Sequence, residues 1–335
     1  MKQLIEIKYT SFLILIKDEE FFSKKLVSHI NKQNVKAEFI IADGSKKKQK
    51  KIFDRLKQKK KYFYFGEDKN QKEFLIKILR GINKCTKKFI FFCDQDDLLN
   101  FRVIKEKEDF LIKNKDYSAV GGNVYSFVYI ENKIKIIKDR YGFYYRYGVY
   151  NLDFKYFFFR YLLNIGFRSA HYLHRRKNLK RIWVIINKSK LEDMRSASLI
   201  QNLLTLNSGR IKYFDKLSLL RWSGTKKREL KKGSSHFLYQ VFKNRYEWFE
   251  YFFSKKKNLI QDILKREKIF FGNFYFYKYF FFFFDISGWA LNRINKYNFL
   301  FRVYKKIILK FYNNEAKIVK ELKSGHIVAK EKIYL

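Results

Sequence analysis

The chain has 335 residues, 47% of them hydrophobic, and its 74 Lys and Arg residues outnumber 32 Asp and Glu residues to give a formal charge of +42. The hydrophobic fraction excludes a chain that is disordered throughout. Two cysteines exclude a disulfide framework and fit a reducing compartment. The charge predicts an anionic partner: a phosphate-bearing ligand, a nucleic acid or an anionic membrane face. Proline is absent where average usage would give about 17, so biased composition is an alternative explanation for part of the charge.

The first hundred residues alternate between strand and helix patterns. Short apolar runs predict strands over residues 11–16, 37–42, 61–65 and 88–93. Apolar residues at helical spacing predict helices over residues 19–31, 52–60 and 72–84. Repeated β–α–β units predict an α/β fold with a mostly parallel, Rossmann-like sheet flanked by helices.

The pattern changes after Asp97. We expect helices over residues 101–114 and 191–207, and strands over residues 118–131, 133–137 and 212–221. From Lys226 onward the sequence is basic, aromatic and helical in pattern. We therefore predict two domains: an α/β domain over residues 1–225 and a basic, aromatic-rich α-helical extension over residues 226–335.

Acidic residues follow two of the predicted strands. Asp43 ends the second strand, and Asp94, Asp96 and Asp97 follow the fourth. Open α/β sheets bind ligands at the carboxyl ends of their strands, and a divalent cation would relieve the repulsion among clustered carboxylates. Oxygen ligands suit Mg²⁺ or Mn²⁺. The alternative is that Asp96 or Asp97 caps a helix that begins near Leu98.

These motifs, in this order, resemble the nucleotide-binding half of a family 2 glycosyltransferase with the GT-A fold. Asp43-Gly44-Ser45 matches the family's acidic D-G-S element, and Asp94-Gln95-Asp96-Asp97 matches its D-x-D-D motif. The resemblance implies that Asp18 and Asp43 lie by the nucleoside. It implies that Asp94 and Asp96 contact the sugar-diphosphate, and that Asp96 and Asp97 are metal ligands.

The resemblance extends over about residues 10–225. Gly121-Gly122 follows the acidic motif as in many members, and Ser169 to Arg175 resembles the segment on the acceptor side. Leu191-Glu192-Asp193 resembles the family's Glu-Asp element, which implies a general base: Asp193, with Glu192 as second choice. A base opposite the leaving group implies inversion at the anomeric carbon. The alternative is that both acids only favour a helix N-terminus.

Three features depart from the family pattern. The usual proline after the first strand is missing, and the Arg-Asn pair that often precedes the acidic strand is only partly present, as Leu79-Arg80-Gly81. The late histidine that often meets the metal or diphosphate has no clean match. Arg221 stands in that region, and we expect it to meet the diphosphate.

The resemblance implies a hexosyltransferase-type enzyme. It would move a sugar from a nucleotide-diphosphate donor to a glycan or lipid-linked hydroxyl, as in the synthesis of cell-envelope polysaccharides, and would use Mg²⁺ or Mn²⁺. No stretch has the pattern of a transmembrane helix or a signal peptide. We therefore expect a cytoplasmic protein with peripheral contact at the inner face of the membrane. The extension either binds anionic lipid or packs on the catalytic domain.

Three other functions stay open at this point. A nucleic-acid-binding protein would use the charge, but nothing in that function requires carboxylates at two strand ends. A nucleotidyltransferase would use an acidic metal site, but the sequence lacks the expected Gly-rich phosphate loop with a lysine. An inactive family member would explain the missing proline and histidine.

Overall fold

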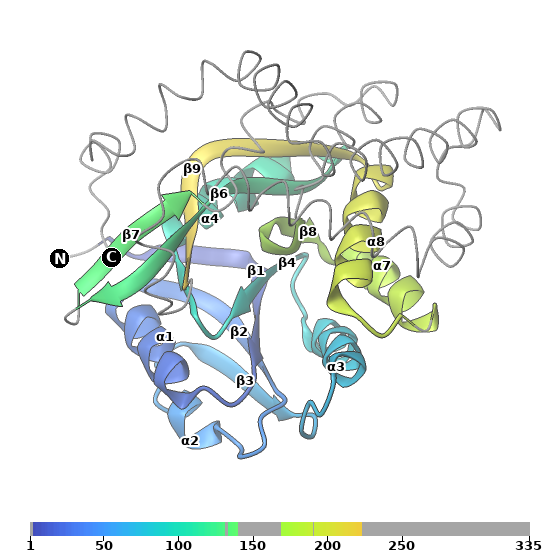
Figure 1. Cartoon of the computed structure of the whole chain (residues 1–335). Helices are drawn as coiled ribbons and strands as arrows, with labels where there is room; N and C mark the ends of the chain where they lie inside the picture. Colours follow the sequence, from blue (N-terminus) through green and yellow to red (C-terminus); the bar gives the residue numbers. More distant parts are fainter. Residues whose placement is uncertain (1–2, 131–132, 140–168, 190, 223–335) are drawn as a thin grey trace, which may run out of the picture. The chain divides into compact units, whose positions relative to one another are not determined.

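The structure is a computed structural model (Figure 1), and it describes residues 3–130, 133–139, 169–189 and 191–222. The predicted extension over residues 226–335 and the boundary near residue 225 lie outside the described residues. The division into two domains therefore stays a prediction.

Nine strands of the described residues form one sheet in the order β3-β2-β1-β4-β8-β6-β9-β5, and β7 pairs with β6. Their bounds are β1 Ile5–Ile16, β2 Val35–Asp43, β3 Lys59–Tyr64, β4 Phe89–Asp94, β5 Asp97–Leu99, β6 Tyr117–Ile130, β7 Lys133–Asp139, β8 Leu173–Arg175 and β9 Arg210–Trp222. β3, β2, β1 and β4 are parallel, so their carboxyl ends lie along one edge. β8 joins β4 in the antiparallel direction and begins the mixed half of the sheet.

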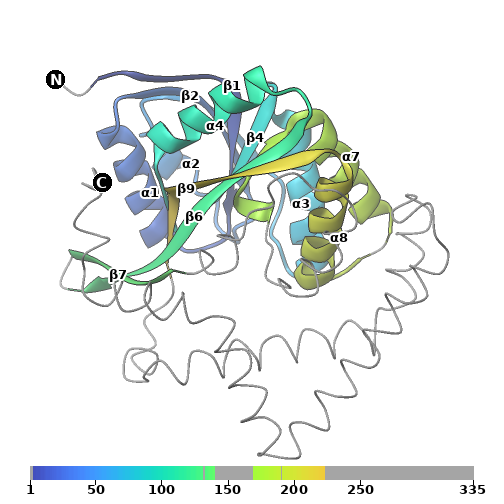
Figure 2. The ribbon, with the colours of Figure 1, turned by 90° about the horizontal axis from the view of Figure 1, so that it is seen from above.

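Helices cover both faces of this sheet. Their bounds are α1 Glu20–Lys32, α2 Lys50–Phe53, α3 Gln71–Lys84, α4 Phe101–Lys113, α7 Arg176–Lys188 and α8 Met194–Asn207, with the 3-10 turn η1 at Ser169–His171. α1 and α2 lie on one side of the parallel strands, and α3, α7 and α8 lie on the other (Figures 1 and 2). None of the described helices is long and apolar enough to span a bilayer.

Aromatic side chains fill the core on the face covered by α1 and α4. The Phe12 ring stacks on Phe39 at 5.1 Å and meets the edge of Phe101 at 5.4 Å, in the geometries that aromatic pairs prefer. On the opposite face, Phe92 of β4 meets Trp183 of α7 at 6.2 Å. Because the central strands are buried on both faces, they are continuous apolar runs.

The predicted fold class is confirmed, and the differences are local. The helix predicted over residues 52–60 is a single turn, because Lys59 and the residues after it pair with β2 as strand β3. The helix predicted from Leu191 begins at Met194. β8 and α7 were not expected: β8 has only three residues, and such a strand has too short a pattern to be found in a sequence.

Candidate active site

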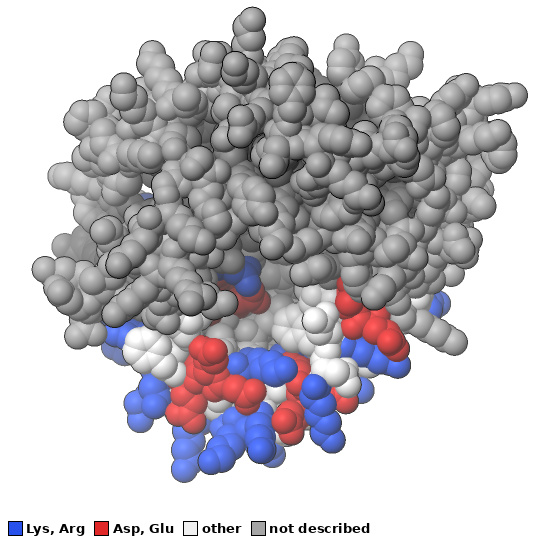
Figure 3. Space-filling view, viewed as in Figure 1, with Lys and Arg blue, Asp and Glu red and all other residues white. Residues whose placement is uncertain are grey.

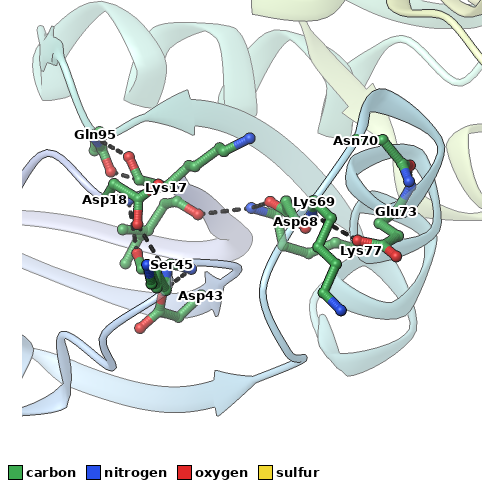
Figure 4. A network of polar contacts seen from close by, with 12 residues as sticks. Lys17, Asp18, Asp43, Ser45, Asp68, Lys69, Asn70, Glu73, Lys77 and Gln95 are labelled. Atoms are coloured by element: carbon green, nitrogen blue, oxygen red, sulfur yellow. Dashed lines mark hydrogen bonds and ion pairs between the residues drawn. The ribbon is translucent and has the colours of Figure 1, made fainter.

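The loops after β1, β2 and β4 meet at the carboxyl edge of the parallel strands. In the sheet register, Ile16 of β1 pairs with Asp43 of β2, and Leu15 pairs with Asp94 of β4. This edge is where open α/β sheets bind ligands. Polar contacts link the loops to one another (Figure 4).

The Asp43 carboxylate is buried and holds the loop that follows it. Its Oδ1 accepts the Ser45 N–H at 2.8 Å, and its Oδ2 accepts the Gln49 N–H at 2.9 Å and the Tyr62 hydroxyl. Burial, and then the Asp43 carboxylate, raise the pKa of Tyr62 above its ordinary value. These contacts give Asp43 a positioning role, and its predicted direct contact with a nucleoside stays a prediction.

Asp18 has a left-handed backbone, with φ 58°. Its N–H donates to Ser45 Oγ at 2.9 Å, its carbonyl accepts Gln49 Nε2 at 2.7 Å, and its Oδ1 accepts the Lys46 N–H at 2.8 Å. Such strain in a residue other than glycine costs about 1–3 kcal/mol and gathers at functional sites. The loop after β2 therefore fixes Asp18 at the edge of the sheet, where the nucleoside was predicted.

Gln95 joins the loop after β4 to the loop after β1. Its Oε1 accepts the Lys17 N–H at 2.8 Å, and its Nε2 donates to the Lys17 carbonyl at 2.9 Å. The amide side chain therefore satisfies both backbone groups of Lys17, and it fixes the acidic motif beside Asp18.

Asp94, Asp96 and Asp97 form an acidic cluster in which one carboxylate oxygen from each lies within 4.8 Å of the others. Asp97 is fully buried. Its Oδ2 accepts the Asp94 N–H at 2.8 Å, whereas no described residue donates a hydrogen bond to its Oδ1. Burial raises the pKa of Asp97 well above its usual value; the charges of Asp94 and Asp96 raise it further, and Arg221 opposes them.

This donor set fits a hard divalent cation. The ligands are carboxylate oxygens, which Mg²⁺ and Mn²⁺ prefer, and the buried Asp97 Oδ1 is an acceptor without a donor. The alternative of a helix cap is wrong: Asp97 begins β5, and Asn100 caps α4 by accepting the Val103 N–H.

Arg221 lies beside the acidic cluster. Its guanidinium donates to Asp94 Oδ2 at 2.5 Å and to His171 Nε2 at 2.6 Å. The residue is opposite Asp97 in the antiparallel register of β5 and β9. His171 was not predicted at the site, because it is 50 residues from Arg221 in the chain and no spacing signals their contact.

Glu192 and Asp193 differ in their surroundings. The Glu192 side chain is 62% exposed and pairs with exposed Lys72 at 3.4 Å. Asp193 caps α8: its Oδ1 accepts the Ser196 N–H at 2.7 Å, and its Oδ2 is buried and accepts no hydrogen bond from the described residues. The capping interpretation is therefore correct for Asp193, and one carboxylate oxygen still stays available.

The first turn of α8 lies at the same edge of the sheet as the acidic residues. The Met194 N–H donates to Gln71 Oε1 at 3.0 Å, and Gln71 begins α3, the helix that follows β3. Since β3 is parallel to β2, its carboxyl end lies at the candidate site. The structure thus places the Glu192–Asp193 element beside the first turn of α3, and its part in the same site as Asp18 and Asp94 stays a prediction.

The fold and this edge define a GT-A protein, and comparison with known families agrees. The family model described as glycosyl transferase family 2 matches residues 11–183, just over half of the chain. The chain therefore belongs to glycosyltransferase family 2, and the predicted family is confirmed.

Among solved structures, the chain is similar to residues 1–349 of S. aureus TarS, with 13% identity and a TM-score of 0.41 over 76% of this chain and 69% of that chain. It is also similar to the same segment in complex with UDP-GlcNAc, with 14% identity and a TM-score of 0.43 over 76% and 70% of the two chains. No curated protein matches the chain.

Proposed function

We propose that this glycosyltransferase moves a hexose from a nucleoside-diphosphate-sugar to a hydroxyl of a glycan or lipid-linked acceptor, with inversion, and with Mg²⁺ or Mn²⁺ as cofactor. The observation that carries the proposal is the acidic cluster at the carboxyl edge, with the buried Asp97 Oδ1 lacking a described donor. Because the chain belongs to glycosyltransferase family 2, we set aside a nucleotidyltransferase and a nucleic-acid-binding protein as its principal function.

The donor side of the site is assembled from three loops. Asp96 and Asp97, together with Asp94, would hold the cation, which supplies positive charge to a diphosphate leaving group. Arg221 adds a fixed positive charge beside them. We assign the nucleoside to the loops of Asp18 and Asp43, which the hydrogen bonds through Ser45 and Gln49 keep in one arrangement.

Asp193 is the proposed general base. Because Oδ1 is held by the Ser196 N–H, the carboxylate is fixed, and the buried Oδ2 has no competing donor among the described residues. The acceptor oxygen forms a bond to the anomeric carbon as its proton moves to Oδ2. The bond from that carbon to the diphosphate breaks, and the electron pair leaves with the diphosphate. Attack from the opposite face inverts the configuration.

Asp193→Asn is expected to abolish sugar transfer and leave donor binding near the wild-type value. The amide oxygen still caps α8, but the group no longer accepts a proton, and loss of a general base costs roughly 10²–10⁴-fold in rate. Glu192→Gln is the matched control and is expected to keep activity, because Glu192 pairs with Lys72 in solvent. Near-normal sugar transfer by Asp193→Asn would contradict the assignment of Asp193 as the base. So would loss of transfer in Glu192→Gln alone.

We propose further that the enzyme works in the cytoplasm at the inner face of the membrane, where anionic lipids attract basic proteins. The support is the formal charge of +42. On the face that Figure 3 shows, Lys and Arg side chains of the described residues alternate with Asp and Glu. Co-sedimentation of the full chain with phosphatidylglycerol vesicles, but not with phosphatidylcholine vesicles, is expected. Equal sedimentation with both would contradict electrostatic attachment.

A further inference from the structure

Helix α3 carries a lysine that is buried next to the loops after β1 and β2. We call these the donor loops, because we assign the nucleoside of the sugar donor to them. Lys77 is 1% exposed, and it forms an ion pair with Asp68, which is 3% exposed. The Lys77 ammonium also donates to the carbonyl of Ile16, the last residue of β1, at 2.6 Å. Figure 4 shows Lys77 and Asp68 to the side of Lys17 and Asp18. Nothing in the proposed chemistry uses either charged group.

The ion pair connects two loops of the candidate site through the loop that follows β3. The Asp68 N–H donates to the Gly44 carbonyl at 2.8 Å, and a Cβ at Gly44 would lie 2.1 Å from the Asp68 carboxylate. Asp68 therefore lies directly against the Asp43-Gly44-Ser45 loop. One ammonium group thus contacts the end of β1 directly and the loop after β2 through Asp68.

A contribution to stability does not by itself explain why the Lys77–Asp68 ion pair is buried. Removing two charges from water is costly, and a well-packed apolar pair of similar volume is often as stable as a buried ion pair or more stable. Burial lowers the pKa of Lys77, and the carboxylates of Asp68, Asp43 and Asp94 raise it. Burial likewise raises the pKa of Asp68, and its bond to Lys77 opposes that shift. Lys77 is therefore held by Asp68, and its pKa also responds to the more acidic neighbourhood that Asp43 and Asp94 create.

We infer that Lys77, through Asp68, is a positioning residue of the donor site: it fixes the loops after β1 and β2 in the arrangement that binds a nucleoside diphosphate. The inference rests on the proposed function, because it assigns nucleotide binding to this edge. The Lys77 ammonium is buried, so it acts through the loops and does not touch the ligand.

The test measures nucleotide affinity in folded variants. UDP, GDP and CDP are titrated with Mn²⁺ into the full chain by calorimetry, and circular dichroism checks folding at the same temperature. Lys77→Met removes the cation, and the double change Lys77→Met with Asp68→Leu removes both charges without leaving one unpaired. Lys107→Met is the matched control, because Lys107 is an equally buried lysine that donates to Ser218 Oγ and not to a donor loop.

The double variant is expected to stay folded, to bind the nucleotide at least tenfold more weakly, and to raise the donor KM with little change in kcat or acceptor KM. Lys107→Met is expected to bind like the wild type. If Lys77→Met does not fold, the double variant carries the test. A folded double variant with wild-type affinity would overturn the inference and leave the proposed function intact. A wild-type chain that binds none of the nucleotides would overturn both.

Discussion

At the scale of single residues, most polar side chains at the carboxyl edge of the parallel strands make hydrogen bonds that fix the neighbouring loops. Asp43 accepts hydrogen bonds from its own loop, and Gln95 satisfies both backbone groups of Lys17. Asp97 and Asp193 differ from these, since each has one buried carboxylate oxygen without a described donor. These two oxygens are therefore the atoms to which we assign cation binding and proton transfer.

Lys107 is expected to make the stability of the protein depend on pH. Burial lowers the pKa of this lysine from its ordinary 10.5 to about 7 in the folded state. Between these two pH values Lys107 is protonated in the unfolded chain more often than in the folded protein. The free energy of unfolding therefore rises as pH rises from about 7 to 10.5, by up to roughly 1.4 kcal/mol per pH unit. Below pH 7 both states are protonated, and this contribution no longer changes.

Denaturant unfolding at pH 7 and at pH 9 checks this prediction. The wild type is expected to gain stability between the two values through Lys107, and Lys107→Met is expected to lose that part of the gain. Parallel behaviour of the two proteins would show that the Lys107 ammonium keeps its ordinary pKa in the folded state.

The sequence pattern by itself indicates candidate site residues that directly follow a strand, whereas Arg221, 127 residues from Asp94, was placed at the site only by the family resemblance. Asp94, Asp96 and Asp97 follow a strand pattern directly, so their position at the edge was foreseeable. Lys77 and His171 were not, because each contact that matters joins distant segments: Lys77 to Ile16, and His171 to Arg221. A lysine within an amphipathic helix also gives no sign that it is buried.

At the scale of elements, paired glycines of β6 allow close approach by two other parts of the fold. A Cβ at Gly121 would lie 2.2 Å from the Tyr172 ring, and one at Gly122 would lie 2.1 Å from Ser218 Oγ. Tyr172 stands between η1 and β8, so β6 packs against the segment that carries His171. The Gly121-Gly122 element therefore has a packing explanation.

Gly121→Ala is expected to lower the free energy of unfolding by about 1–3 kcal/mol, the usual cost of adding volume to a packed core. The effect is measured by denaturant unfolding. Tyr172→Leu is expected to relieve the clash, so adding Gly121→Ala to that variant should cost much less. A Gly121→Ala protein as stable as the wild type would contradict the packing explanation.

Element prediction succeeded where periodicity was strong and failed where tertiary pairing decided the structure. The apolar faces of α1, α3 and α4 were recognised, and the four parallel strands were recognised from their runs. Residues 52–60 are basic and lack a wide apolar stripe, so the helix ends at Phe53 and pairing with β2 begins at Lys59. The three residues of β8 become a strand only because β4 and β6 flank them.

At the scale of the whole molecule, the account depends on one claim: the carboxyl edge binds a nucleoside diphosphate together with a divalent cation. The charge of +42 by itself favours any anion. Binding of one particular nucleotide that requires the divalent cation would distinguish a site at the acidic cluster from this general attraction of anions. Asp96 is the residue to change, because it is partly exposed and belongs to the cluster.

The most direct measurement is the thermal stability of the wild type and of Asp96→Ala with UDP, GDP, CDP or CMP, with and without Mn²⁺. We predict that one nucleoside diphosphate raises the wild-type Tm only when Mn²⁺ is present. At a hundredfold excess over Kd the rise is roughly 5–10 °C, and Asp96→Ala abolishes it. Stabilisation by none of the nucleotides, or equal stabilisation of both proteins, would contradict the proposed donor site.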